Sequence, residues 1–247
     1  MSLKRLDQIL VLRQLAESRT RAQALIETGR IQVNGITVTK AASQVSEDAS
    51  ITVIDPHNVC PFVSRGGIKL EHALQIFGID VSGRVCLDVG ASTGGFTHCL
   101  LLRGARYVHA VDVGYGQLHW TLRTDPRVGV HERTHIKDVT CDMLVPPPEI
   151  AVMDVSFISI LKVIPYLQAL LPPNALLVSL IKPQFEVGKG KVGKGGVVRD
   201  PDVRIQTVQT VLSGAEVLGC TRIAGPIESP ITGPAGNIEY LAAFQFK

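Results

Sequence analysis

The chain has 247 residues, of which 45% are hydrophobic and 19% are charged, and its formal net charge is +3 at pH 7. This composition indicates a globular protein with enough apolar material for a core, in one large domain or two smaller ones. The small net charge excludes nucleic-acid binding through bulk charge, so any such role depends on local basic patches.

The cysteines and the apolar segments indicate a cytoplasmic protein. The five cysteines form no C-x-x-C pair, and most lie in apolar runs, which is typical of reduced core residues in the cytosol. The N-terminus lacks the apolar segment of a secretory signal. The longest charge-free apolar run, residues 163–181, is interrupted by Pro165, Pro172, Pro173 and Asn174. We therefore expect a helix, a turn and a buried strand there, and no membrane association.

The first 40 residues are basic, with seven Lys or Arg against three acidic residues. Their apolar spacing predicts two short helices over 6–17 and 18–29, the second with Ser18 as its N-cap. The Asn34-Gly35 dipeptide then predicts a hairpin between two strands, and a third strand is expected at 51–55.

This region resembles the S4-type RNA-binding domain through KRLDQIL, SRTRAQALIETGRIQVNG and ITV, over residues 2–54. The resemblance implies a basic helix face and a hairpin that bind structured RNA mainly through its phosphates. The candidate RNA-binding residues are Lys4, Arg5, Arg19, Arg21 and Arg30. A small helix-hairpin domain with solvated charges is the alternative interpretation. We expect this domain to span 1–58, a linker 59–64, and a second domain 65–247.

After the linker, short apolar strands alternate with helices. The expected strands are 85–90, 107–114, 128–135, 150–157, 175–183, 220–229 and 240–246, and the expected helices are 94–104, 159–171 and 203–219. This alternation predicts an α/β fold with a mostly parallel sheet covered by helices on both faces. Ligands of such sheets bind at the carboxyl ends of the strands.

The first of these strands runs into a glycine turn, DVGASTGGFT, at 88–97. Its glycines allow a sharp bend and bring a helix N-terminus close to a ligand. Asp112 closes the next strand 24 residues after Asp88, where its carboxylate could accept hydrogen bonds from the hydroxyls of a ribose diol. The pattern leaves open S-adenosylmethionine, a dinucleotide, or a tight turn without a ligand. The candidate cofactor-binding residues are Asp88, Gly90, Ala91, Ser92, Gly94, Gly95, Phe96, Asp112 and Asp154.

Six motifs in the second domain resemble the TlyA (haemolysin A-like) family of ribosomal RNA 2′-O-methyltransferases. They are SRGGIKLEHA, CLDVGASTGGFT, VDVGYGQLHW, MDVSFIS, IKPQFE and GNIEYL, and the resemblance covers essentially the whole chain. It implies an FtsJ-type, Rossmann-like methyltransferase sheet whose last strand is antiparallel, with S-adenosyl-L-methionine as the cofactor. The haemolysin name leaves a pore-forming cytolysin as an alternative, and a non-catalytic RNA-binding or ribosome-assembly factor is another.

The resemblance also implies a catalytic Lys-Asp-Lys-Glu tetrad, which falls on Lys69, Asp154, Lys182 and Glu239. A lysine can act as a base toward a ribose hydroxyl only where its charge is disfavoured, and a charged lysine can stabilise a developing alkoxide. We expect Lys182 to be this base or stabiliser and Asp154 to orient it. Both follow apolar strands, where an unpaired charge would be costly.

Other residues are weaker candidates. Phe157 either packs in the core or stacks on the target base, and Arg65 is a candidate RNA contact. Trp120 either lines the cofactor or packs in the core, and packing is favoured. The histidines show no metal-binding spacing, so no metal is expected.

The loop GKGKVGKGG, residues 188–196, has the G-x-x-x-x-G-K spacing of a phosphate-binding P-loop. Gly195, however, stands where a P-loop needs Ser or Thr for magnesium, so ATP binding is disfavoured. We expect the loop to contact RNA phosphates through Lys189, Lys191, Lys194 and Arg199, a solvated surface loop being the alternative. The implied partners are ribosomal RNA and ribosomal subunits, with 23S RNA favoured over 16S RNA, and no obligate protein partner.

Overall fold

The computed structural model describes residues 3–54, 60–188, 190, 192–193 and 195–247. The chain divides into two compact units, Met1–Cys60 and Pro61–Lys247. Lys189, Lys191 and Lys194 of the basic loop lie outside the described residues.

The smaller unit combines two helices with two small antiparallel sheets. Its elements are β1 (Leu3–Arg5), α1 (Leu6–Leu12), α2 (Arg19–Glu27), β2 (Ile31–Val33), β3 (Ile36–Thr37), β4 (Gln44–Ser46) and β5 (Ile51–Val53). The expected hairpin joins β2 to β3, with Asn34 and Gly35 at positive φ as a tight turn requires. Ser18 caps α2 by accepting a hydrogen bond from the Arg21 backbone N–H (3.2 Å). The pairing of β1 with β4 was not expected, because strands of three residues are too short to show alternation.

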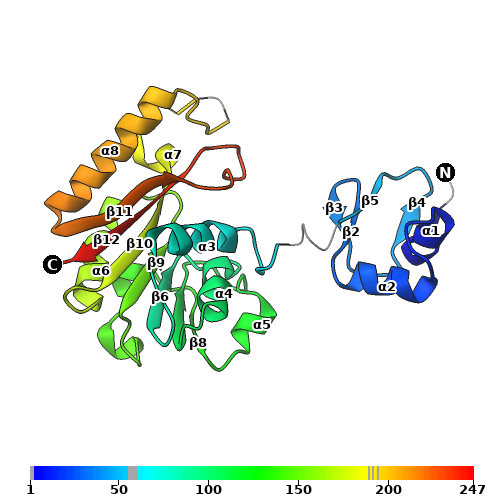
Figure 1. The fold of residues 1–247 in the computed structure, drawn as a ribbon, viewed down its shortest axis with the longest axis horizontal. Coiled ribbons are helices and arrows are strands. Elements are labelled where there is room, and N and C mark those ends of the chain that lie inside the picture. The colour runs from blue at the N-terminus through cyan, green and yellow to red at the C-terminus, as the bar shows by residue number, and fades with distance from the viewer. Residues whose placement is uncertain (1–2, 55–59, 189, 191, 194) are drawn as a thin grey trace. The chain divides into compact units, whose positions relative to one another are not determined.

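The larger unit is built on a seven-stranded sheet of order β11-β12-β10-β9-β6-β7-β8 (Figure 1). The strands are β6 (Val85–Val89), β7 (Tyr107–Val111), β8 (Val128–His131), β9 (Ile150–Met153), β10 (Leu176–Ile181), β11 (Cys220–Glu228) and β12 (Tyr240–Phe246). The pairs from β8 to β10 are all parallel, and β12 runs antiparallel to both of its neighbours. This order confirms the expected mostly parallel, Rossmann-like sheet with a reversed last strand.

Helices cover both faces of this sheet. The α-helices are α3 (Gly66–Phe77), α4 (Gly95–Leu102), α5 (Trp120–Arg123), α6 (Ile164–Leu170), α7 (Pro183–Glu186) and α8 (Pro201–Val217), and the 3₁₀ helices are η2 (Ile136–Asp138), η3 (Cys141–Met143) and η4 (Ile160–Lys162). One core packs α6 and α8 against the sheet around Phe244 and Leu167, and the other packs α3 and α4 around Leu100 and Leu74. All five residues of β6 are buried, as in a central strand covered on both faces.

Several expectations about the elements of this unit need correction. The strands expected at 107–114 and 150–157 end at Val111 and Met153. The strand expected at 128–135 ends at His131, and the chain then turns at Arg133, which has a positive φ of 54°. Helix α3 was not expected, although its residues include the SRGGIKLEHA motif, because two glycines open it and weaken its helical pattern.

Candidate active site

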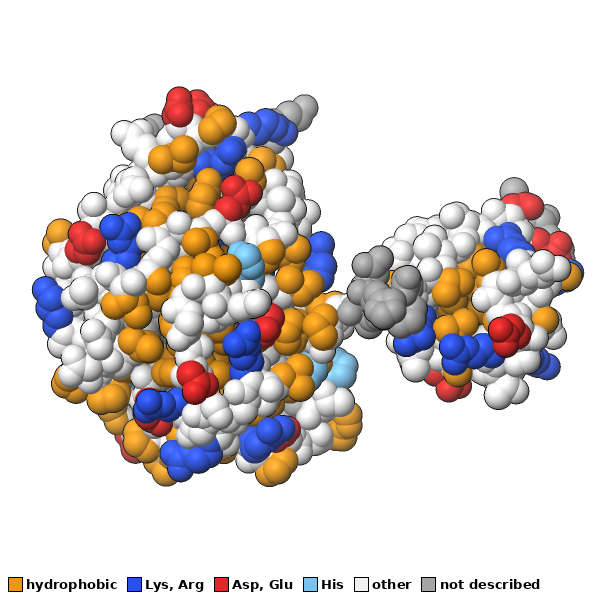
Figure 2. All heavy atoms as spheres, in the orientation of Figure 1, with side chains coloured by type: hydrophobic (Ala, Val, Ile, Leu, Met, Phe, Trp, Pro, Cys, Tyr) orange, Lys and Arg blue, Asp and Glu red, His pale blue; other side chains and the backbone are white. Residues whose placement is uncertain are grey.

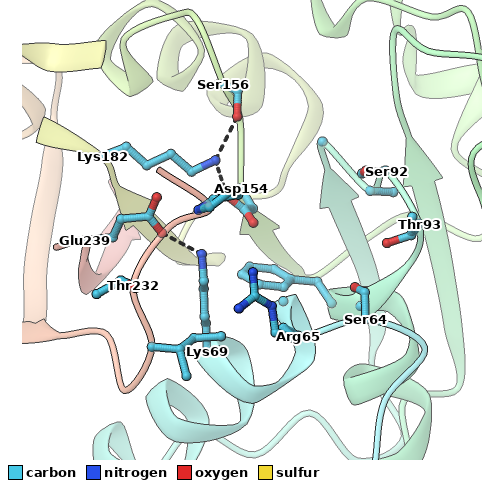
Figure 3. Close-up of a pocket in the computed structure, with 17 residues that line it drawn as sticks. Ser64, Arg65, Lys69, Ser92, Thr93, Asp154, Ser156, Lys182, Thr232 and Glu239 are labelled. Carbon is cyan, nitrogen blue, oxygen red and sulfur yellow. Dashed lines mark hydrogen bonds and ion pairs between the residues drawn. The ribbon is translucent and has the colours of Figure 1, made fainter. Parts of the chain in front are cut away.

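Four charged side chains gather at the carboxyl edge of the sheet as two ion pairs (Figure 3). Lys182, which follows β10, places Nζ 2.6 Å from Oδ1 of Asp154, which follows the adjacent strand β9. Lys69 of α3 places Nζ 2.5 Å from Oε2 of Glu239, which precedes β12. Three of these side chains are at most 11% exposed and Asp154 is 21% exposed, so each charge depends on its partner.

The glycine turn lies against the backbone of Asp154. Gly90 has a φ of +85°, and a Cβ at this position would lie 2.7 Å from the Asp154 carbonyl oxygen. Only glycine fits both the conformation and the contact. The absence of a side chain at Gly90 therefore brings the turn after β6 next to the Lys182–Asp154 pair.

Two adjoining cavities open at this edge. The first, of about 290 Å³, is lined by the four charged residues of the ion pairs, by Arg65, and by Gly90, Ala91, Ser92, Gly95 and Phe96 of the glycine turn. The second, of about 740 Å³, is lined by Asp112 with apolar side chains that include Val111, Ile136 and Val163. Gly90, Ser92, Asp154 and Ser156 line both cavities, so the two meet at the Lys182–Asp154 pair.

The sequence patterns missed several residues of these cavities. Thr232 and Pro234 belong to the loop before Glu239, and Thr134 and Ile136 follow β8. No motif marks them, because loops brought in from distant parts of the chain carry no local periodicity. Ser156 lies inside the DVSF motif, but nothing in the sequence predicts a role for its hydroxyl separate from that of Asp154.

Asp112 holds the rim of the second cavity. Its Oδ2 accepts a hydrogen bond from the Ser92 backbone N–H (2.8 Å) and its Oδ1 accepts one from the Gly114 N–H (2.7 Å). Each carboxylate oxygen has a further lone pair available to a ligand hydroxyl. The second cavity thus combines a fixed carboxylate with apolar walls, which suits a nucleoside.

Asp88 and Gly94, in contrast, line neither cavity. Asp88 is fully buried, and its Oδ2 accepts a hydrogen bond from the Thr97 hydroxyl (2.6 Å). Its Oδ1 has no partner among the described residues. Burial raises the pKa of Asp88 to about 7, because the ionised form is poorly solvated. Asp88 therefore supports the turn from beneath and does not face the ligand space.

The raised pKa of Asp88 makes the stability of the larger unit depend on pH. The folded carboxyl keeps its proton to a higher pH than the unfolded one, so its contribution is complete below about pH 4 and is lost as the pH rises toward 7. We expect Asp88→Asn, which cannot ionise, to gain about 4 kcal/mol relative to the native chain between pH 4 and pH 8. Urea unfolding of both proteins across this range measures the gain, and a difference that stays constant with pH would contradict the role of burial.

Two aromatic residues lie on the surface beside the site. Phe157 is 89% exposed, has a positive φ of 66°, and lies with its ring centroid 4.9 Å from that of Phe185. A bulky residue in this conformation is held there by its surroundings at a cost in free energy. Of the two expectations for Phe157, core packing is wrong, and stacking on a base remains a proposal. The expectation that Trp120 packs in the core is also wrong, because its side chain is 70% exposed.

Comparisons with known proteins show the family to which the chain belongs. The sequence profile of the FtsJ-like methyltransferases matches residues 62–246, and that of the S4 domain matches residues 4–51. The chain is 48% identical to the 16S/23S rRNA (cytidine-2′-O)-methyltransferase TlyA of Mycobacterium tuberculosis, over 96% of this chain and 87% of that protein. The chain belongs to the TlyA family of FtsJ-like methyltransferases.

Other members of the TlyA family carry a different name. Hemolysin A of Brachyspira hyodysenteriae is 44% identical over 97% of this chain and 99% of its own length. The solved structure of a putative hemolysin from Streptococcus thermophilus is 35% identical, with a TM-score of 0.76 over 100% of this chain and 90% of that one. No helix in the described part of this chain is long and apolar enough to cross a membrane.

In the S4 domain of this TlyA family member, several of the basic residues already have acidic partners. Arg5 and Arg19 both bind Asp7, whose side chain is fully buried, and their hydrogen bonds lower its pKa. Lys4 is paired with Glu47 at 2.5 Å. Basic and acidic side chains are interspersed on the visible face of each unit (Figure 2). Within the described residues, Arg21 and Arg30 make no ion pair, which leaves their guanidinium groups to solvent or a ligand.

Gly196 at the end of the basic loop, and Val198 just after it, form hydrogen bonds with the loop before Glu239. The side chain of Asn237 accepts a hydrogen bond from the Val198 N–H (3.0 Å) and donates one to the Gly196 carbonyl (2.9 Å). Arg199, next to Val198, is exposed. Among the described residues, no group of three or more His, Cys, Asp or Glu is placed to hold a metal ion.

Proposed function

We propose that the chain is an S-adenosylmethionine-dependent methyltransferase that transfers a methyl group to the ribose 2′-hydroxyl of cytidine in ribosomal RNA, acting on ribosomal subunits in the cytoplasm. The observation that carries this proposal is the buried Lys182–Asp154 ion pair at the junction of a nucleoside-sized cavity and a second, charged cavity. The M. tuberculosis relative is named for this reaction.

The larger cavity has the chemistry to hold S-adenosylmethionine. Its volume of about 740 Å³ lies within the usual range for small-molecule sites. Val111, Ile136 and Val163 offer apolar contacts to an adenine ring, and Asp112 offers carboxylate oxygens to the ribose hydroxyls. The methionyl end would extend past Gly90 toward the cavity of the ion pairs. When bound, the cofactor supplies a methyl group already activated by its sulfonium.

What remains for the protein is to position the acceptor hydroxyl and to remove its proton. Lys182 takes this proton in those molecules whose amine is neutral, so the rate rises with pH. As the hydroxyl O–H bond breaks, the proton and positive charge pass to Nζ, next to the Asp154 carboxylate at 2.6 Å. The Lys69–Glu239 pair lines the same cavity and would hold the ribose by hydrogen bonds.

RNA recognition is distributed over several groups of residues. The S4 domain would contact phosphates through Arg21 and Arg30 and through the outer edges of Arg5, Arg19 and Lys4. Near the site, Arg65 and Arg199 would contact the backbone around the target, with Lys189, Lys191 and Lys194 as further expected contacts. The exposed ring of Phe157 would stack on the target base.

A labelled-cofactor assay tests the proposal directly. Purified protein with methyl-tritiated S-adenosylmethionine and either small or large ribosomal subunits is expected to label ribosomal RNA. Alkaline hydrolysis should leave the label in an alkali-stable dinucleotide, because 2′-O-methylation blocks cleavage at the adjacent phosphodiester. Label in a mononucleotide would indicate base methylation instead, and the absence of label from both subunits and from their naked RNA would refute the function.

A further inference from the structure

We infer that Ser156 is a positioning residue for Lys182, which sets the direction in which the Lys182 amine faces the acceptor hydroxyl. The inference rests on the proposed function. Lys182 Nζ donates a hydrogen bond to Ser156 Oγ at 2.8 Å, in addition to its ion pair with Asp154 (Figure 3).

The geometry of an amine nitrogen gives this contact its meaning. Beyond its bond to carbon, Nζ has three tetrahedral positions. In the neutral amine, two of them carry hydrogens and the third carries the lone pair. Ser156 Oγ accepts one of these hydrogens, whereas the 2.6 Å contact with Asp154 Oδ1 is an ion pair without hydrogen-bond geometry. With that hydrogen fixed, the lone pair is limited to the two remaining positions of the amine, in the cavity that Lys182 lines. Without the Ser156 hydroxyl, the amine can rotate about its terminal bond and the lone pair loses its fixed direction.

Ser156 lies at the place where the direction of the Lys182 lone pair matters for the reaction. It is one of four residues that line both cavities, and therefore lies at the junction that the transferred methyl group must cross. Its loop is anchored four residues later, where Glu186 of α7 accepts a hydrogen bond from the Ile160 N–H at 2.9 Å. The serine hydroxyl is covalently held in this loop, unlike a water molecule, which would have to be ordered for each reaction.

A purely structural role does not explain this serine. Ser156 is exposed, so water can satisfy its hydroxyl, and Lys182 would keep its ion pair with Asp154 if that hydroxyl were lost. Ser159, three residues later, has the structural role in this loop. Its hydroxyl accepts a hydrogen bond from the Leu161 N–H at 3.2 Å and caps η4. The two serines make a matched pair for experiment.

The charged groups around Lys182 determine the direction of the pH effect. Asp154 after β9 forms the ion pair with Lys182, and Arg65 and the Lys69–Glu239 pair line the same cavity from the start of α3 and of β12. The carboxylate of Glu186 in α7 already accepts a hydrogen bond from the Ile160 N–H. The Ser156 oxygen accepts a stronger hydrogen bond from an ammonium than from a neutral amine. Its removal should therefore favour the neutral amine.

Ser156→Ala is expected to lower kcat about 10-fold at the high-pH plateau, with KM for RNA and for S-adenosylmethionine within about twofold of the native values. The ascending limb of its pH–rate profile should move to lower pH. Ser156→Thr, which keeps the hydroxyl, should restore the native kcat and the native position of the limb. Ser159→Ala should leave the limb where it is, although it should lower the midpoint of thermal unfolding.

A second readout does not require activity. An NMR titration of the Lys182 side chain, assigned by its absence in Lys182→Met, should show a lower midpoint in Ser156→Ala than in the native chain. The inference would be overturned if neither the ascending limb of the pH–rate profile nor the NMR midpoint of Lys182 moved in Ser156→Ala. It would also be overturned if Ser156→Thr did not restore the native kcat. If the native chain methylates no RNA, the proposed function fails, whereas the NMR midpoint still decides whether Ser156 controls the amine.

Discussion

Lys182→Ala is expected to lower methyl transfer to ribosomal RNA about 10³-fold and to leave cofactor affinity within a few-fold of the native value. The loss follows from removing the only group that we place as the base, since general-base catalysis contributes about 10²- to 10⁴-fold. Cofactor affinity should survive because Lys182 lines the cavity of the ion pairs and not the larger one around Asp112. Single-turnover transfer and calorimetric titration with S-adenosylmethionine measure the two effects separately.

The variant Lys182→Arg distinguishes a base from an electrostatic stabiliser. Arginine keeps the positive charge beside Asp154 but does not give up its proton near neutral pH. If Lys182 is the base, the arginine variant should be nearly as inactive as the alanine variant. Substantial transfer by the arginine variant would instead assign Lys182 to stabilising the alkoxide, and full activity of Lys182→Ala would remove the residue from the mechanism.

The sequence predicts this part of the site well, for a physical reason. Asp154 and Lys182 each follow a short apolar run, and the carboxyl ends of adjacent parallel strands meet at one edge of a sheet. Once the alternation of strands and helices is recognised, the proximity of the two residues follows. Gly90 could likewise be placed at this edge, because it ends the strand on the other side of β9.

Other parts of the site depend on packing that no local pattern encodes. Lys69 comes from a helix and Glu239 from a loop, and only the family resemblance joined them. Asp88 belongs to a strand buried on both faces, so alternation cannot reveal that its side chain faces the core and not the ligand. The hydrogen bond of Ser156 depends on the rotamer of a lysine from another strand. The exposed Trp120 opposes the general tendency of large aromatic residues to be buried.

Breaking the Lys69–Glu239 pair is expected to destabilise the larger unit by about 3–5 kcal/mol, because removing one partner leaves a buried charge uncompensated. The side chains of Lys69 and Glu239 are 8% and 1% exposed, so water cannot replace the missing partner. In Lys69→Met, Gln184 is the one described side chain that still donates a hydrogen bond to the Glu239 carboxylate, at 3.3 Å.

The double variant Lys69→Met, Glu239→Gln should recover most of this stability, since it buries no net charge, yet it should remain inactive in methyl transfer. Arg84→Met provides the control. Arg84 and Glu149 are also 2.5 Å apart, but their side chains are 55% and 38% exposed, so loss of that pair should change the free energy of unfolding little. Urea unfolding of the four proteins measures these differences. Equal losses of unfolding free energy in Lys69→Met and Arg84→Met would show that burial does not set the strength of the pair. An active double variant would show that the charges of Lys69 and Glu239 stabilise the fold and are not needed for the reaction.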